Sequence, residues 1–256
     1  MSHSLQQDPG SAPGHEGETP VELHERRRAA IVATIPDRYS AAVHLAIPTT
    51  LGALALIGAV LLLKEPRLVD LWTIPITLFA GFGLEWRVHK DVLHRRIPGL
   101  SLLYKRHELA HHVTYTYDDL EMRGRRELWL ILMPAYAIVI AFAMTSIFAI
   151  AVAALFGNNV ALLMVATSMV FFLSYEWLHM AYHLPVDSWI GRRSVIRTLR
   201  ELHRRHHDPR LMKRWNFNVT VPLFDYIHRS AWSPERELAR SRRRSERPKS
   251  QHHPAL

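Results

Sequence analysis

The sequence contains no cysteine among its 256 residues. This absence excludes disulfide bonds, thiolate metal ligands and catalysis by a thiol nucleophile. Any metal ion that the chain binds must therefore be held mainly by histidine and carboxylate side chains. The first 20 residues also lack the apolar segment of a secretory signal, and they are rich in glycine, proline, serine and acidic residues. We expect a disordered polar N-terminus over residues 1–28.

Four long stretches are nearly free of charge, and they cover residues 43–63, 69–84, 128–156 and 160–178. The second can be extended to residue 88. About 20 apolar residues cross the hydrocarbon core of a bilayer. The third stretch is longer than that, so it must tilt, kink near Pro134 or begin in the interface. Buried core helices of a soluble protein are the alternative. We predict an all-α integral membrane protein with four transmembrane helices and one domain over residues 29–232.

Positive charge is distributed unevenly about these stretches. Four spans place both termini and the loop over residues 87–127 on one side, which then carries 30 of the 32 Lys and Arg residues. The other side carries only Lys64 and Arg67. This asymmetry predicts a cytoplasmic location for the basic side. The net charge of +9 then indicates a membrane surface rather than nucleic acid as the partner. We expect a basic disordered tail over residues 233–256.

Histidine is the most informative residue type in this chain, and ten of its 17 copies fall into four groups. The groups are His89 and His94; His107, His111 and His112; His179 and His183; and His203, His206 and His207. Imidazole is a neutral ligand for iron, zinc and copper. Two groups follow the second and fourth spans, and two lie in the basic loop and tail. Four spans therefore bring all ten histidines to one face, which predicts a cytoplasmic helical cap with a dimetal site.

The spacing within the groups limits how each could bind an ion. His179 and His183 are four residues apart and share one face of a helix. His89 and His94 are five apart, about 140° around an ideal α-helix. Either the helix ends between them or each serves a different ion. The doublets at 111–112 and 206–207 point apart on a helix, so they suit a bridge between two metals.

Two glutamates near the ends of the second and fourth spans are the predicted supporting residues. Glu85 lies four residues before His89, and Glu176 lies three before His179. A carboxylate at the edge of a bilayer is costly unless it has a partner. We predict that both accept hydrogen bonds from ligand N–H groups. The alternative is that each glutamate pairs with a nearby arginine such as Arg87 or reaches water.

Two other functions remain open at this point. The residues from His107 to His111 read HExxH, which is the signature of zinc proteases with Glu108 as the general base. This motif leaves the other eight histidines unexplained. A non-enzymatic metal-handling membrane protein is the third reading. Its histidines should line a path through the bilayer, whereas the apolar stretches contain only His44.

Taken together, these patterns resemble the fatty acid hydroxylase/sterol desaturase superfamily of membrane oxygenases. The resemblance runs from about residue 84 to residue 230. It rests on Glu85-Trp86-Arg87-Val88-His89 through His94, on Tyr175-Glu176 before His179 and His183, on HxxHH at 203–207, and on Asn216-Phe217-Asn218-Val219-Thr220 with Pro222 and Asp225. One departure is the three residues between His107 and His111, where lipid 2-hydroxylases of this group usually have two. This departure leaves the substrate class open.

The resemblance implies that the ten histidines hold a non-haem di-iron centre, in which zinc can replace iron. It also implies dioxygen-dependent hydroxylation or desaturation of a C–H bond in a membrane lipid, with a fatty acid or a sterol-like molecule as substrate. Some members carry a fused b-type cytochrome domain, for which residues 1–42 are too short. The expected electron donor is therefore a separate b-type cytochrome, or a ferredoxin with its reductase. The oligomeric state stays open.

Overall fold

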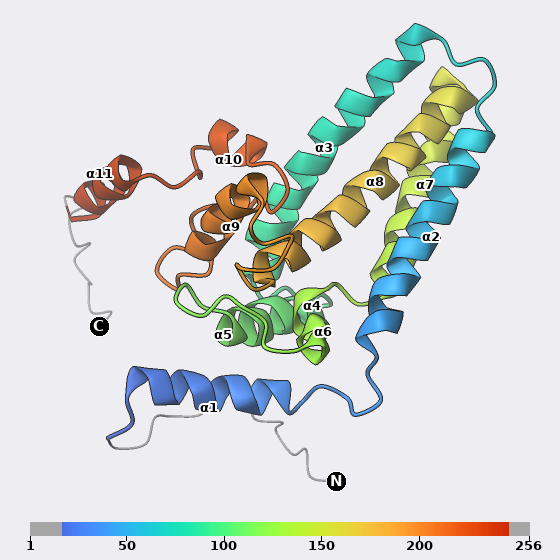
Figure 1. The fold of residues 1–256 in the computed structure, drawn as a ribbon. Helices are drawn as coiled ribbons and strands as arrows, with labels where there is room; N and C mark the ends of the chain where they lie inside the picture. The colour runs from blue at the N-terminus through green and yellow to red at the C-terminus, as the bar shows by residue number, and fades with distance from the viewer. Residues whose placement is uncertain (1–16, 246–256) are drawn as a thin grey trace, which may run out of the picture.

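The computed structural model describes residues 17–245, and this part of the chain is helical with no strand. Within it, four helical segments are long and apolar enough to cross a membrane. They contain α2 (Ala41–Leu61), α3 (Thr73–Val88), α7 (Ala137–Phe156) and α8 (Asn158–His183). The predictions of an all-helical class and of four candidate spans are confirmed. Figure 1 shows these helices running side by side in one tilted bundle.

Helix α8 organises the bundle because it packs against α2, α3 and α7. Glycines allow close approach at two of these contacts. A side chain at Gly52 of α2 would meet Leu173 of α8, and one at Gly81 of α3 would meet the ring of Phe171. The outward faces of the helices keep many large apolar side chains exposed. A water-soluble protein seldom exposes so much apolar surface, whereas lipid tails solvate it.

The third apolar stretch, residues 128–156, does not form one continuous helix. A short helix, α6 (Leu128–Ile131), ends where Leu132 adopts an extended conformation. Pro134 follows, and α7 begins only at Ala137. Proline lacks the backbone N–H of a helix interior and disfavours a helical residue before it. Of the three expectations for this stretch, a break at Pro134 is the one that the structure shows.

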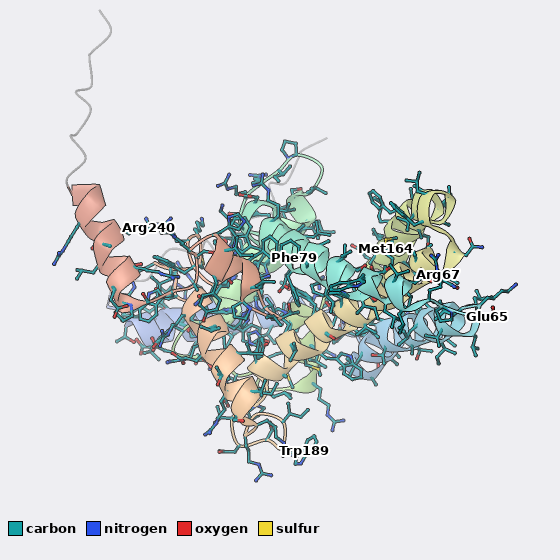
Figure 2. All side chains as sticks on the ribbon, turned by 90° about the horizontal axis from the view of Figure 1, so that it is seen from above. Glu65, Arg67, Phe79, Met164, Trp189 and Arg240 are labelled. Carbon is teal, nitrogen blue, oxygen red and sulfur yellow. The ribbon has the colours of Figure 1, made fainter. Side chains whose placement is uncertain are left out.

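The turns at one end of the bundle are joined to each other. The backbone N–H of Lys64 donates to Asn159 Oδ1 (3.0 Å), and Asn159 Nδ2 donates to the Lys64 carbonyl (2.7 Å). Nearby, Arg67 Nη2 forms an ion pair with Asp70 Oδ1 at 2.9 Å. Figure 2 shows Glu65 and Arg67 at this end, remote from Trp189 and Arg240. In this view Arg240 lies at the opposite end of the molecule from Glu65 and Arg67, and Trp189 lies at the lower edge between them.

The shorter elements gather at the other end of the bundle and form a cap (Figure 1). Besides α6, they are α1 (Pro20–Val32), α4 (Ser101–Tyr104), α5 (His112–Thr114), α9 (Ser194–His206), α10 (Leu223–Ile227) and α11 (Pro234–Ser245), with π-helical segments η3 (His89–Leu93) and η4 (Lys105–His111). The 3-10 segment η5 (Arg125–Glu127) lies before α6. The cap has its own apolar core, formed in part by Ile31, Tyr115, Leu120 and Leu128.

The prediction of disorder is wrong for residues 20–28. Helix α1 begins with a capping box in which Thr19 Oγ1 accepts from the Glu22 N–H (3.3 Å) and Glu22 Oε2 accepts from the Thr19 N–H (2.8 Å). Further along, the buried Arg28 forms ion pairs with Asp119 (2.9 Å) and Glu127 (2.6 Å). These contacts fix α1 against the cap. The folded unit therefore includes residues before the predicted boundary at 29.

The prediction of a disordered tail over residues 233–256 is also wrong in part. Residues Pro234–Ser245 form helix α11. Arg236 Nη1 donates to the Ala231 carbonyl (2.8 Å), and the guanidinium of Arg240 lies over the ring of Trp215 at 4.9 Å. Both contacts join this helix to the segment before it. Residues 1–16 and 246–256 lie outside the described part of the chain.

Candidate metal centre

All ten histidines named above lie in one buried cluster, and none has more than 8% of its surface exposed. Nine of them fall into two groups whose candidate ligand atoms lie within 4.8 Å of one another. The first group is His89, His94, His107, His112 and His206, and the second is His111, His179, His183 and His203. The tenth, His207, approaches the second group, with its Nε2 3.0 Å from Nε2 of His203. Each group can hold a metal ion.

The π-helical segments explain how residues five apart reach the same group. A π-helix bonds residue i to residue i+5, so it brings these two residues to one side. Segment η3 begins at His89 and ends at its cap, His94. In η4 and its cap, the backbone N–H of His112 donates to the carbonyl of His107. Both pairs belong to the first group, so a π turn replaces the α-helical geometry assumed from the sequence.

Adjacent histidines are divided between the two groups. His111 belongs to the second group, although its neighbours His107 and His112 belong to the first. Likewise, His206 belongs to the first group, whereas His207 approaches the second. The ring centroids of His112 and His207 lie 4.2 Å apart in a stacked arrangement. The predicted bridging arrangement of the two doublets agrees with this division.

Backbone carbonyls orient five of the ten rings through Nδ1. Bonds of 2.7–3.1 Å run from His111 to Leu130, from His183 to Leu120, from His206 to Trp215 and from His207 to Tyr115. His89 Nδ1 donates to the carbonyl of Phe217 in the same way. A carbonyl oxygen can only accept, so the ring proton is at Nδ1. The lone pair of Nε2 then points into the cluster, as a metal ligand requires.

These lone pairs lie close together in both groups. Nε2 of His206 is 2.9 Å from Nε2 of His94. Nε2 of His111 is 3.2 Å from Nε2 of His179. Burial, followed by repulsion from neighbouring rings, holds the pKa of His206 and His111 well below the usual range, so both are neutral at pH 7. Ligand bonds of about 2.1 Å at right angles place two nitrogens about 3 Å apart. The donor set therefore fits a cation in each group.

The roles predicted for Glu85 and Glu176 are wrong. Glu85 accepts hydrogen bonds from the backbone N–H groups of Val219 and Thr220, and from Asn218 Nδ2 (3.2 Å). Glu176 accepts from the backbone N–H of Met133 (3.1 Å). Among residues 17–245, neither carboxylate bonds to a histidine ring or forms an ion pair with an arginine. Glu85 affects the histidines only indirectly. It holds the segment that follows Phe217, and the Phe217 carbonyl orients the His89 ring.

A third carboxylate, Glu108, has the role predicted for Glu85 and Glu176. Its side chain accepts a hydrogen bond from Nδ1 of His94 and forms an ion pair with Nζ of Lys213 at 2.9 Å. Burial opposes ionisation of Glu108, but the bonds from His94 and Lys213 together hold its pKa below the usual value. Within the described residues, it is the one carboxylate bonded to any of the ten rings. The sequence placed Glu108 beside two histidines, but the HExxH pattern suggested a general base.

A narrow cavity of about 30 Å³ reaches the cluster from the side of the helix break. Rings of both groups line it, namely His107 from the first group and His111 and His179 from the second. Its other walls include Leu93, Leu103, Ile131, Met133, Pro134 and Tyr175, together with the side chain of Arg106. The cavity has room for roughly two water-sized spheres. A space of this width admits no more than a single extended hydrocarbon chain, and it adjoins rings of both groups.

Comparisons of this chain with family models, with curated proteins and with solved structures found no match. The function is therefore inferred from the geometry of the centre and its surroundings.

Proposed function

We propose that this chain is a membrane-bound oxygenase that uses two histidine-bound iron ions to hydroxylate or desaturate a C–H bond of a lipid. One observation carries the proposal: two groups of buried imidazoles adjoin an apolar cavity at one end of four apolar helices. The ligands are the ten histidines, five on each side of the cluster when His207 is counted with the second group. The resemblance to the fatty acid hydroxylase/sterol desaturase superfamily supports the same function.

The chemistry follows from the ligands and from the walls of the cavity. Imidazole suits iron, zinc and copper, and the chain has no thiolate to favour zinc. An apolar chain in this cavity offers C–H bonds rather than a polar bond for hydrolysis. Bound iron would supply the redox chemistry by which dioxygen, together with two electrons from a donor, oxidises such a bond. The residues of the chain orient the rings, place the lipid against them and keep water from the centre.

The proposal includes a cytoplasmic location for the cap and a separate electron donor. The cap contains nearly all of the positive charge that the positive-inside rule assigns to the cytoplasm. A b-type cytochrome, or a ferredoxin with its reductase, would deliver the electrons on that side. The lipid would come from the bilayer, where the helix break adjoins the cavity.

The geometry gives less support to a zinc protease. An HExxH site requires both histidines on one ion and a glutamate that faces the attacking water. Here His107 and His111 belong to different groups, and Glu108 is bonded to His94 and Lys213. A metal-transport function also has little support, because the candidate ligands gather at one end of the bundle. The one histidine within α2, His44, bonds to neighbouring protein groups.

Metal analysis and lipid mass spectrometry test the proposal together. The full chain would be expressed with added iron, and lipid extracts compared with those of cells that express His183→Ala. We expect two iron ions per chain and a lipid that gains one oxygen atom or loses two hydrogen atoms, only with active protein, dioxygen and reductant. Unchanged lipids from iron-loaded protein with a competent reductase would refute it. Proteolysis that Glu108→Gln abolishes and His179→Ala spares would instead identify the protease.

A further inference from the structure

The cavity beside the histidines contains one guanidinium without a carboxylate partner. Arg106 lines the cavity next to His107, and its side chain is partly buried. Nη2 donates to the carbonyls of Trp129 (2.7 Å) and Leu132 (3.4 Å), and the guanidinium lies over the Trp129 ring at 4.8 Å. Among the residues that the structure describes, no carboxylate forms an ion pair with Arg106. Within this part of the chain, Nε and Nη1 of Arg106 make no hydrogen bond, which leaves three N–H donors for a ligand.

Other buried arginines of the cap have acidic partners. Arg28 pairs with two carboxylates, and Arg200 Nη2 lies 3.1 Å from Glu121 Oε1. Such pairing is expected, because a guanidinium removed from water is costly unless a counter-charge accompanies it. Arg106 differs from these two residues, because no carboxylate of the described chain forms an ion pair with it. The Glu176 carboxylate attracts Arg106 electrostatically from a longer distance, but its hydrogen bond goes to the backbone N–H of Met133. Arg106 therefore lacks a directly bonded counter-charge, which an anionic ligand would supply.

The bonds that Arg106 makes do not require its charge. Helix α6 ends at Ile131, and its last carbonyls have no partner within the helix. An amide N–H from glutamine could satisfy the carbonyls of Trp129 and Leu132 equally well. Arg106 is the one charged side chain in a cavity whose other walls are apolar residues, Tyr175 and histidine rings, and its fork suits an anion such as a carboxylate or a phosphate.

We propose that Arg106 binds the anionic end group, a carboxylate or a phosphate, of a single-chain amphiphile whose hydrocarbon passes through the cavity. The inference rests on the proposed function for its chemical consequence but not for the binding itself. The hydrocarbon leaves past Met133 and Pro134 toward the first turns of α7, where Val139 and Ile140 are exposed. This placement keeps the apolar tail of the amphiphile in the bilayer and its charged end group at Arg106 in the cap.

The short cavity restricts which carbon can react. Arg106, His107, His111 and His179 all line the same space of about 30 Å³. An end group held by Arg106 therefore places the first carbons of the chain, rather than its far end, against the histidines. In hydroxylation there, a C–H bond breaks and a C–O bond forms. Dioxygen is reduced by two electrons from the donor and by the substrate C–H bond, and its second oxygen leaves as water with two protons.

Equilibrium binding to the zinc-loaded full chain in phosphatidylcholine bilayer discs tests this inference without turnover. The probes are hexadecanoate, hexadecyl phosphate and hexadecanol, which share one chain and differ in the end group. We expect the favoured anion to bind about tenfold to a hundredfold more tightly than the alcohol, which is the range for a charged hydrogen bond. Whichever anion is favoured identifies the end group.

Three variants locate the preference. Arg106→Gln should lose it, and Arg106→Lys should keep part of it. The matched control is Lys105→Gln, which removes the same charge from the exposed neighbouring position, outside the cavity, and should keep the full preference. Equal binding of all three probes to the unmodified chain would overturn the inference. So would a preference that survives Arg106→Gln, even if that variant melts at a lower temperature.

The outcome also separates this inference from the proposed function. If the Arg106-dependent preference holds but iron-loaded protein oxidises no lipid, the binding site stands and the oxygenase does not. If lipids are oxidised only at carbons remote from the end group, the oxygenase stands and the predicted position of reaction near the Arg106-bound end group is refuted.

Discussion

Replacing Glu108 by glutamine should weaken metal binding in one histidine group and leave the other unchanged. Glu108 is 5% exposed and accepts a hydrogen bond from Nδ1 of His94, a member of the first group. In the second group, by contrast, Nδ1 of His111 and Nδ1 of His183 donate to backbone carbonyls. A carboxylate partner makes an imidazole a stronger donor than a carbonyl partner does. The two ions should therefore be bound unequally.

Glutamine cannot replace both of the bonds that Glu108 makes. His94 Nδ1–H and the Lys213 ammonium are both donors, and each needs an acceptor oxygen. Glutamine offers one oxygen, and its amide N–H₂ would face one of the two donors. Loss of a hydrogen-bond partner behind a metal ligand typically costs tenfold to a hundredfold in affinity. That range corresponds to about 1.4–2.7 kcal/mol for the ion of the first group.

A competition titration of the metal-free full chain with Zn²⁺ or Co²⁺ resolves the two affinities. The expected result for Glu108→Gln is one weakened site and one unchanged site. Asp208→Asn is the matched control, because Asp208 is also buried and follows His207, but it pairs with Arg210 at 2.6 Å and bonds to no ring. Equal weakening of both sites, or of neither, in a variant with an unchanged melting temperature would refute the assignment of Glu108 to the first group.

Three further predictions follow from the same contacts. His112→Ala should weaken only the first group and His183→Ala only the second, so titrations of the two variants should lose opposite sites. Burial holds the pKa of buried cap rings such as His206 well below the usual value, so the folded metal-free chain resists protonation whereas the unfolded chain is protonated below about pH 6.5. The free energy of unfolding of the metal-free chain should thus be constant above that pH and fall below it, by up to about 1.4 kcal/mol per pH unit for each such ring. Melting curves between about pH 8 and 5 measure this fall. No fall would mean that the rings are already charged in the folded chain. Glu85→Ala should destabilise the cap by about 3 kcal/mol or more, since several buried donors lose their acceptor. Glu176→Ala should cost less, because it removes the acceptor of one backbone N–H, that of Met133. Equal melting temperatures of these two variants would contradict that ranking.

The four candidate spans could be predicted because length and lack of charge are properties of the linear sequence. For example, the first predicted stretch, residues 43–63, differs by only a few residues from helix α2 (Ala41–Leu61). The exception is residues 128–136, which are apolar but belong to the cap and to the break at Pro134. Hydropathy alone cannot tell a residue buried in protein from one that faces lipid. Leu128, Leu130 and Ile131 are buried in the protein.

The partners of charged residues were the least predictable feature. Helix α1 looked like a polar, unfolded segment because the acids that bind Arg28 lie far along the chain, at Asp119 and Glu127. Similarly, Glu85 and Glu176 were assigned to the nearest histidines, whereas their hydrogen bonds go to segments that follow later or lie on another helix. Spacing along a helix predicts neighbours on that helix. It does not predict which distant backbone groups compete for the same carboxylate.

The five-residue spacings connect the sequence to the geometry of the centre. In an α-helix, a residue shares its face with the residue four positions on, and in a π-helix with the residue five positions on. An HxxHH segment can therefore align its first and last histidines within an α-helix. The HxxxHH segment of this chain has one more residue, and η4 accommodates it with a π turn that still aligns His107 with His112. His111, one position earlier, then faces the second group. The same device in η3 aligns His89 with His94. Because π turns are rare and occur frequently at functional sites, two of them at the histidines indicate that the centre, and not local helix preference, determines the backbone here.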